Sequence, residues 1–146
     1  MTPEGRFADG ARDVTIAPAD GITFSRADAS ALAQAKAANH CGTGILLRLA
    51  GLVPGDLRRL YLAGAFASYI DVANAIDIGF IPPVAQERVD KVGNASLRGA
   101  RIMLLSGSRR AGVDALVRRI EHVELETHPD FFDLFVEGCR FAPIEI

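Results

Sequence analysis

The sequence predicts an α/β fold in which a sheet is flanked by helices. An apolar strand, a turn rich in small residues and a helix follow one another twice, over residues 60–78 and residues 88–105. Two such units place both turns at the carboxyl edge of a parallel sheet, where open α/β folds bind ligands. With 146 residues, 49% of them hydrophobic, the chain is long enough to bury a core. We therefore expect a single α/β domain over residues 1–146.

The first part of the chain predicts short strands and then one long helix. The β-prone segments are separated by Asp-Gly and Ala-Pro-Ala-Asp-Gly turns and lie at residues 6–7, 14–16 and 22–24. Ser25 then opens the helix, with Asp28 at the capping-box position, and Gly51 ends it. Its many alanines predict close packing on a neighbouring sheet. Gly42 and Gly44 lower helix stability, so close packing or a ligand is expected to compensate for them.

The middle of the chain carries the two strand-turn-helix units. Residues 60–63 are consecutively apolar, which predicts a strand covered on both faces. Asp71 is placed to cap a short helix that Gly79 closes. A second strand over residues 88–92 leads into a helix that begins at Ala95.

The last third predicts two helices and a strand. Residues 108–121 form an amphipathic pattern whose arginines lie outside the apolar side. These arginines either contact a phosphate or an acidic partner, or form a solvated face. Val123 and Leu125 suggest a last strand. Residues 129–136 read as a helix whose phenylalanines either close the core or offer a docking surface.

Composition excludes several classes of protein. A formal net charge of −2 gives no basic footprint for nucleic acid. The apolar runs are too short to span a bilayer, and no secretory signal follows Met1, so we expect a cytoplasmic protein without a membrane segment. Cys41 and Cys139 stand apart from each other and from clustered histidines, so a structural role is expected for both, and no metal site is assigned.

The two turns are the candidate ligand site. Small residues after the first strand let the backbone approach a nucleotide or phosphate closely. The candidates at these turns are Gly64, Ala65, Phe66, Ser68, Gly93 and Asn94. Lys36, on the long helix, is a further candidate for a ribose or phosphate contact. The alternatives are a tight strand-to-helix connection for the first turn and a solvent-exposed position for Lys36.

Five segments together resemble a known family. They are Ala35-Lys36-Ala37-Ala38, Leu62-Ala63-Gly64-Ala65-Phe66, Ala75-Ile76-Asp77-Ile78-Gly79, Val92-Gly93-Asn94-Ala95 with Gly99-Ala100, and His128-Pro129-Asp130-Phe131 with Phe135. In this order they resemble the C-terminal, actin-like domain of the iron-sulfur reductive activators of corrinoid-dependent methyltransferases. The resemblance spans residues 5–142 and implies a ribonuclease H-like, actin-like ATPase lobe, here the C-terminal lobe of a longer protein.

The resemblance implies a function as well as a fold. Such activators use ATP with Mg²⁺ to drive an electron onto an inactive cob(II)alamin centre. In them the turn represented here by Gly64, Ala65 and Phe66 resembles the adenosine-binding motif. Their iron-sulfur cluster lies in another domain, and no residue of this chain stands in for its cysteines. Ala67 and Leu97 depart from the family pattern, which carries glycine at both positions, and their side chains would hinder a close nucleotide.

Two functions remain open from the sequence. The chain is either the nucleotide-binding lobe of an ATP-dependent activator, inactive by itself, or a non-catalytic module that docks a corrinoid protein or self-associates. Phosphoryl transfer needs groups from both sides of a cleft, and no catalytic residue is assigned in this lobe. The expected partners are a corrinoid protein, the remaining lobe of a longer protein and a second copy in a homodimer.

Overall fold

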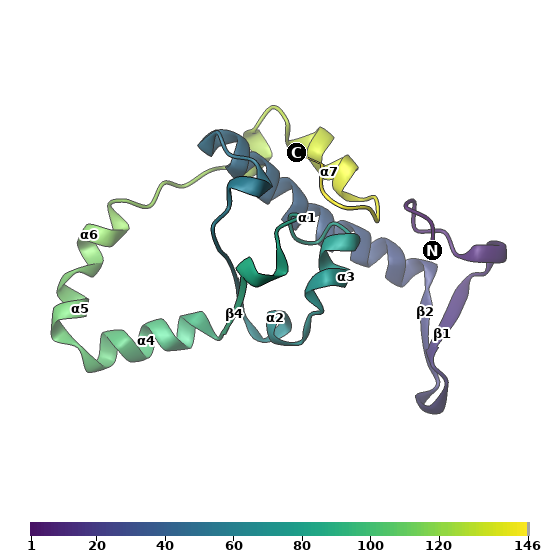
Figure 1. Ribbon diagram of the computed structural model, residues 1–146, viewed down its shortest axis with the longest axis horizontal. Coiled ribbons are helices and arrows are strands. Elements are labelled where there is room, and N and C mark those ends of the chain that lie inside the picture. Colours follow the sequence, from purple (N-terminus) through teal and green to yellow (C-terminus); the bar gives the residue numbers. More distant parts are fainter. Residues whose placement is uncertain (146) are drawn as a thin grey trace.

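The computed structural model describes residues 1–145, apart from the side chain of Asp9, and is built around one long helix (Figure 1). This helix, α1 (Arg26–Ala50), begins at a capping box. Ser25 Oγ accepts from the Asp28 N–H at 3.2 Å, and Asp28 Oδ2 accepts from the Ser25 N–H at 2.8 Å. Gly51 ends the helix in the left-handed conformation. Both ends are as the sequence predicts, because capping depends on residues adjacent in the chain.

The core lies between α1 and α7 (Phe131–Gly138). Cys41 and Ile45 of α1 pack against Leu134 of α7, and all three are buried. Four partly buried side chains surround them, Val123, Leu125, Phe131 and Phe135. The two helices approach most closely at Gly138, where a Cβ atom would lie 2.9 Å from Ala37 Cα. The small residues of α1 thus serve a helix–helix contact, whereas the sequence predicted a contact with a sheet.

The chain also forms two small two-stranded sheets. Strands β1 (Asp13–Ala17) and β2 (Ile22–Ser25) form an antiparallel hairpin. Strands β3 (Leu60–Ala63) and β4 (Val89–Gly93) pair in parallel, with Leu60 opposite Val89 and Ala63 opposite Gly93. The parallel pair confirms the predicted sheet edge. The prediction that the first strand is covered on both faces is wrong, because the Tyr61 side chain of β3 is 63% exposed.

Two short helices follow β3. Helix α2 (Ala65–Tyr69) begins directly after Gly64, and α3 (Val72–Asp77) follows it. Asp71 Oδ1 accepts from the Asn74 N–H at 2.9 Å, so the predicted cap of α3 is confirmed. Lys91 on β4 reaches across to this region, where its Nζ donates to the Ile70 carbonyl at 2.6 Å.

Helices α4 (Ala95–Leu105), α5 (Gly107–Ala111) and α6 (Val113–Val117) form an arc that stands away from the body of the molecule (Figure 1). None of the three contains a buried residue. The predicted single helix over residues 108–121 is wrong. The chain breaks at Gly112 and the helical part ends at Val117.

Two predicted strands are also wrong. Residues 6 and 7 lie in an irregular segment before a 3₁₀ turn (Ala8–Gly10). Val123 lies in a coil, and Leu125 is the first residue of another 3₁₀ turn, η5 (Leu125–Thr127). Their apolar alternation reflects packing against the α1–α7 core instead of pairing with a strand.

Candidate functional site

The two glycine turns meet at the carboxyl edge of the β3–β4 pair. The Gly64 N–H donates to the Gly93 carbonyl at 2.8 Å. Both glycines have positive φ, 101° for Gly64 and 64° for Gly93, a region that side chains with a Cβ rarely adopt. A Cβ atom built on either glycine would meet nothing within 4 Å. The glycines are therefore required by the backbone path, and the space in front of both turns is open.

Several candidate residues are already engaged within the chain. The Gly64 N–H binds Gly93, so it is not available to a ligand. Asn94 caps α4, because its Oδ1 accepts from the Leu97 N–H at 2.9 Å. Ser68 Oγ donates to the Gly64 carbonyl at 3.5 Å. Ala65 and Phe66 form the first turn of α2, whose N–H groups have no acceptor within that helix.

A cavity of about 260 Å³ lies beside the first turn. It is bounded by side chains of α1, β3, α2 and the segment after α3, which are Asn39, Tyr61, Leu62, Ala63, Phe66, Ala67, Ile70, Phe80 and Ile81. Every one of these side chains is uncharged. The cavity therefore suits a flat, largely apolar group such as a nucleobase, and it offers no cation to a phosphate.

Aromatic contacts hold the wall of this cavity in place. The Phe66 and Phe80 rings meet edge to face, with centroids 5.9 Å apart and planes at 67°. Asn39 of α1 donates through Nδ2 to the Phe80 carbonyl. Phe66 itself is 67% exposed. The contacts fix Phe80 against α1 and leave a face of Phe66 accessible.

Asn39, Tyr61 and Phe80 line the cavity but were not predicted from the sequence. Asn39 and Phe80 come from α1 and the segment after α3, and folding brings both beside β3. Tyr61 alone had a local signal, because it precedes the glycine turn by three positions.

Lys36 lies elsewhere, in the interior between α1 and α7. Its side chain is completely buried, and Nζ donates to the Gly138 carbonyl. Nζ also lies 5.5 Å from the centre of the Phe141 ring. Burial lowers the pKa of Lys36 from its ordinary value. The solvent-exposed alternative is wrong, and Lys36 has no accessible surface with which to contact a ribose or phosphate in this structure.

The two departures from the family pattern differ in their surroundings. Ala67 is 9% exposed and forms part of the cavity wall. Leu97 is 67% exposed in the first turn of α4. The alanine methyl narrows the cavity, whereas the leucine lies in solvent beside the second turn.

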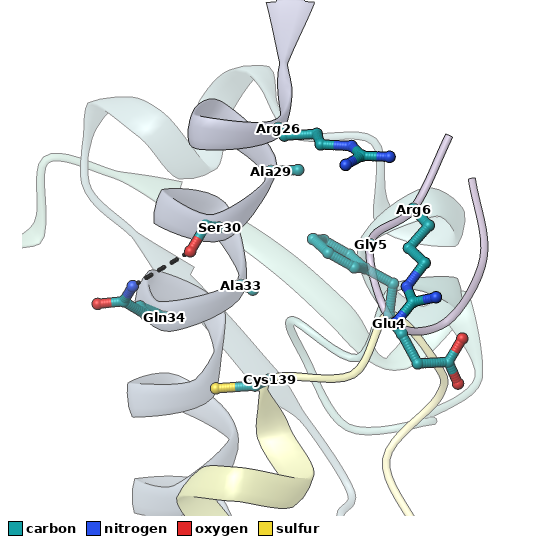
Figure 2. Close-up of a pocket in the computed structure, with 10 residues that line it drawn as sticks. Glu4, Gly5, Arg6, Arg26, Ala29, Ser30, Ala33, Gln34 and Cys139 are labelled. Carbon is teal, nitrogen blue, oxygen red and sulfur yellow. Dashed lines mark hydrogen bonds between the residues drawn. The ribbon is translucent and has the colours of Figure 1, made fainter. Parts of the chain in front are cut away.

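A second cavity, of about 410 Å³, lies between the N-terminal segment, α1 and the chain after α7. Figure 2 shows Arg26 projecting from the start of α1 and Arg6 from the N-terminal segment. Ser30 and Gln34 lie farther along α1, with Gln34 Nε2 donating to Ser30 Oγ at 3.4 Å. This cavity is not predicted from the sequence, because its walls come from opposite ends of the chain.

The sequence and the fold resemble those of known proteins. The family model described as the C-terminal domain of RACo, the ASKHA domain, matches residues 2–145. The chain belongs to this family. Membership in the RACo C-terminal domain family confirms the resemblance drawn from the five segments and supports an actin-like α/β fold.

Relatives of this domain are proteins of corrinoid activation. The chain is 35% identical over 121 residues to the corrinoid activation enzyme RamQ of Eubacterium limosum, covering 83% of this chain and 20% of RamQ. It is 28% identical over 118 residues to the [Co(II) methylated amine-specific corrinoid protein] reductase of Methanosarcina barkeri, covering 80% of this chain and 22% of that reductase.

A solved structure supports the same assignment. A reductive activator for corrinoid, iron-sulfur protein superimposes with a TM-score of 0.81 and 31% identity, covering 96% of this chain and 23% of that one. The chain thus spans about a fifth of the length of the proteins that it matches. No helix within residues 1–145 has both the length and the apolar character needed to cross a membrane.

Proposed function

We propose that this chain is the nucleotide-binding C-terminal part of an ATP-dependent reductive activator of corrinoid proteins. The observation that carries the proposal is the hydrogen bond that the Gly64 N–H donates to the Gly93 carbonyl at 2.8 Å. It joins two glycine turns with open space before them at one edge of a parallel strand pair. Ligands of α/β folds bind at this edge, and the chain belongs to a family of actin-like domains.

The adenosine part of ATP fits the residues beside these turns. Phe66 and Phe80 would contact the base in the uncharged cavity, with Tyr61 at its rim. The backbone at Gly64 and Gly93 allows close approach of the ribose because neither residue carries a Cβ. When bound with Mg²⁺, ATP would supply, through phosphoryl transfer, the free energy that drives the electron transfer.

The phosphates need groups that this cavity does not supply. Phosphoryl transfer is catalysed by positioning and by charge stabilisation around the metal-bound phosphates, whereas the lining side chains are all uncharged. We therefore place the phosphate and Mg²⁺ contacts on another lobe of a longer protein. Nucleotide hydrolysis by the isolated chain is not expected. A ribonuclease H-like arrangement would be completed by the strands of that protein.

The partner and the redox centre follow from the same family. The relatives are named as activators or reductases of corrinoid proteins, which supports a corrinoid protein as partner. The iron-sulfur cluster of the proposed activator would lie in a separate domain. Cys41 and Cys139 are unpaired thiols, which supports the reducing interior of the cytoplasm as the location.

A docking module remains the second candidate function. The observation that favours it is the exposure of large apolar side chains on α4, with Leu104 at 78% and Leu105 at 72%. Exposed apolar patches mark interaction surfaces. In this alternative the chain recognises another protein and binds no nucleotide.

Calorimetric titration with ATP or ADP in the presence of Mg²⁺ distinguishes the two functions. Saturable binding that Phe66→Ala abolishes is the expected result. Tyr69→Ala is the matched control, because Tyr69 lies on the same short helix, is 90% exposed and does not line the cavity. Absence of binding, or equal loss in both variants, would contradict the nucleotide site.

A further inference from the structure

Two of the side chains that line the cavity beside Gly64 can form hydrogen bonds. They are Asn39 of α1 and Tyr61 of β3, whereas the other lining side chains are hydrocarbons. Bases are told apart by hydrogen bonds at their edges, because stacking on an aromatic ring accepts every base. Any choice among bases by the side chains of this cavity therefore depends on Asn39 or Tyr61.

Tyr61 is poorly suited to make that choice. Its side chain is 63% exposed, and a hydroxyl can rotate to donate or to accept. It can therefore bind an amino group and a carbonyl equally well. The amide of Asn39 has a separate donor end and acceptor end, so it distinguishes these two groups as long as it cannot rotate.

The Phe80 carbonyl fixes the orientation of the Asn39 amide. Asn39 Nδ2 donates a hydrogen bond to this carbonyl oxygen. A carbonyl oxygen only accepts, so a rotated amide would bring Oδ1 against it. Within residues 1–145 no group donates to Asn39 Oδ1, and the residue is exposed where it lines the cavity. Oδ1 and the second N–H of the amide are thus available to a ligand.

The backbone around Phe80 is itself held in place. The Phe80 N–H donates to the Ala75 carbonyl at 2.8 Å, and the Ile81 N–H donates to the same oxygen at 3.3 Å. Ile81 is buried. The φ of Gly79 is 72°, and a Cβ there would collide with the backbone of the last segment of the chain. The Asn39 amide is therefore oriented before a ligand arrives.

An amide held in this way matches the edge of adenine. Adenine carries an amino group at C6, with a ring nitrogen acceptor, N1 or N7, on either side of it. An asparagine amide binds such an edge through two hydrogen bonds, with Oδ1 accepting from the amino group and N–H donating to the ring nitrogen. Hypoxanthine and guanine carry a carbonyl at C6, which would place two oxygens against each other.

We propose that Asn39 selects nucleotides with a 6-aminopurine base, and that the Phe80 carbonyl positions its amide for this choice. The inference rests on the nucleotide site proposed above and adds the residue that distinguishes among bases there. The base would pack against the accessible face of Phe66, and its C6 edge would point to α1.

Titration of the unchanged chain with ATP and with inosine triphosphate, each with Mg²⁺, tests the choice. The two nucleotides differ only at the C6 edge, where inosine has a carbonyl and a protonated N1. Calorimetry should show that ATP binds about 5- to 150-fold more tightly, as one bidentate amide contact predicts. If neither nucleotide binds, the nucleotide site itself is overturned. If both bind equally, the role of Asn39 is overturned and the nucleotide site stands.

Two variants assign the preference to one side chain. Asn39→Leu should bind ATP as weakly as inosine triphosphate and so lose the preference. Tyr61→Phe is the matched control and should keep it, because it removes the other polar group of the cavity. Circular dichroism should show that both variants are folded. An unchanged ratio or complete loss of both nucleotides in Asn39→Leu would show a merely structural role and overturn the proposal, as would loss of the preference in Tyr61→Phe.

Discussion

Gly138→Ala tests the helix contact on which the core rests. A Cβ atom at this position would lie 2.9 Å from Ala37 Cα and 3.0 Å from His40 Cβ. Ordinary contacts between carbon atoms are about 3.5–4.0 Å, so α7 must move away from α1. The movement opens the packing of Cys41, Ile45 and Leu134. Overpacking of this kind costs about 1–3 kcal/mol.

Thermal and urea unfolding, followed by circular dichroism, measure this cost. For a chain of this size the loss corresponds to a fall in Tm of about 3–10 °C. Gly99→Ala is the matched control, because a Cβ atom there meets nothing within 4 Å and alanine favours a helix by about 1 kcal/mol. Equal or greater stability of the Gly138→Ala chain would refute the close contact between α1 and α7.

Three further predictions concern the cap, the turn and a buried histidine. Ser25→Ala removes the capping box of α1 and should lower the free energy of unfolding by about 1 kcal/mol, measured by urea denaturation. Gly64→Ala forces a Cβ onto a backbone with φ of 101° and should cost about 1–3 kcal/mol in the same assay. An unchanged urea midpoint of unfolding would contradict the prediction for that variant. His40 is buried and its Nε2 has no partner in the described chain, and burial lowers the pKa of His40 from its ordinary value. The unfolded chain therefore binds the extra proton first, so stability should fall as pH drops below about 6.5 toward that lowered pKa. Unfolding at several pH values should show a smaller loss over this window for His40→Gln, and an equal loss would contradict the assignment.

Features set by neighbouring residues could be predicted from the sequence. Ser25 and Asp28 form the expected cap because the bonds join positions three apart. The two turns could be expected to meet, because strands with helical crossovers pair in parallel and bring their carboxyl ends together. The Gly64–Gly93 hydrogen bond is the result.

Features set by distant packing could not be predicted in this way. Lys36 is buried by a contact with Gly138, 102 positions away, and no local pattern specifies that contact. Apolar Val123 and Leu125 alternate with polar residues, as they would in a strand. The pattern arises because both side chains pack against the α1–α7 core. The cavity beside Gly64 could not be predicted either, because Asn39 and Phe80 line it from separate elements.

The most direct test of the nucleotide site is the amide chemical-shift map of the ¹⁵N-labelled chain during titration with ATP and Mg²⁺. The two cavities lie on different parts of the structure, so the map separates them. We predict saturable shifts at Gly64, Ala65 and Asn94, with no shift at Arg26. Shifts confined to the cavity of Arg6 and Arg26, or no shifts at any concentration, would contradict the account.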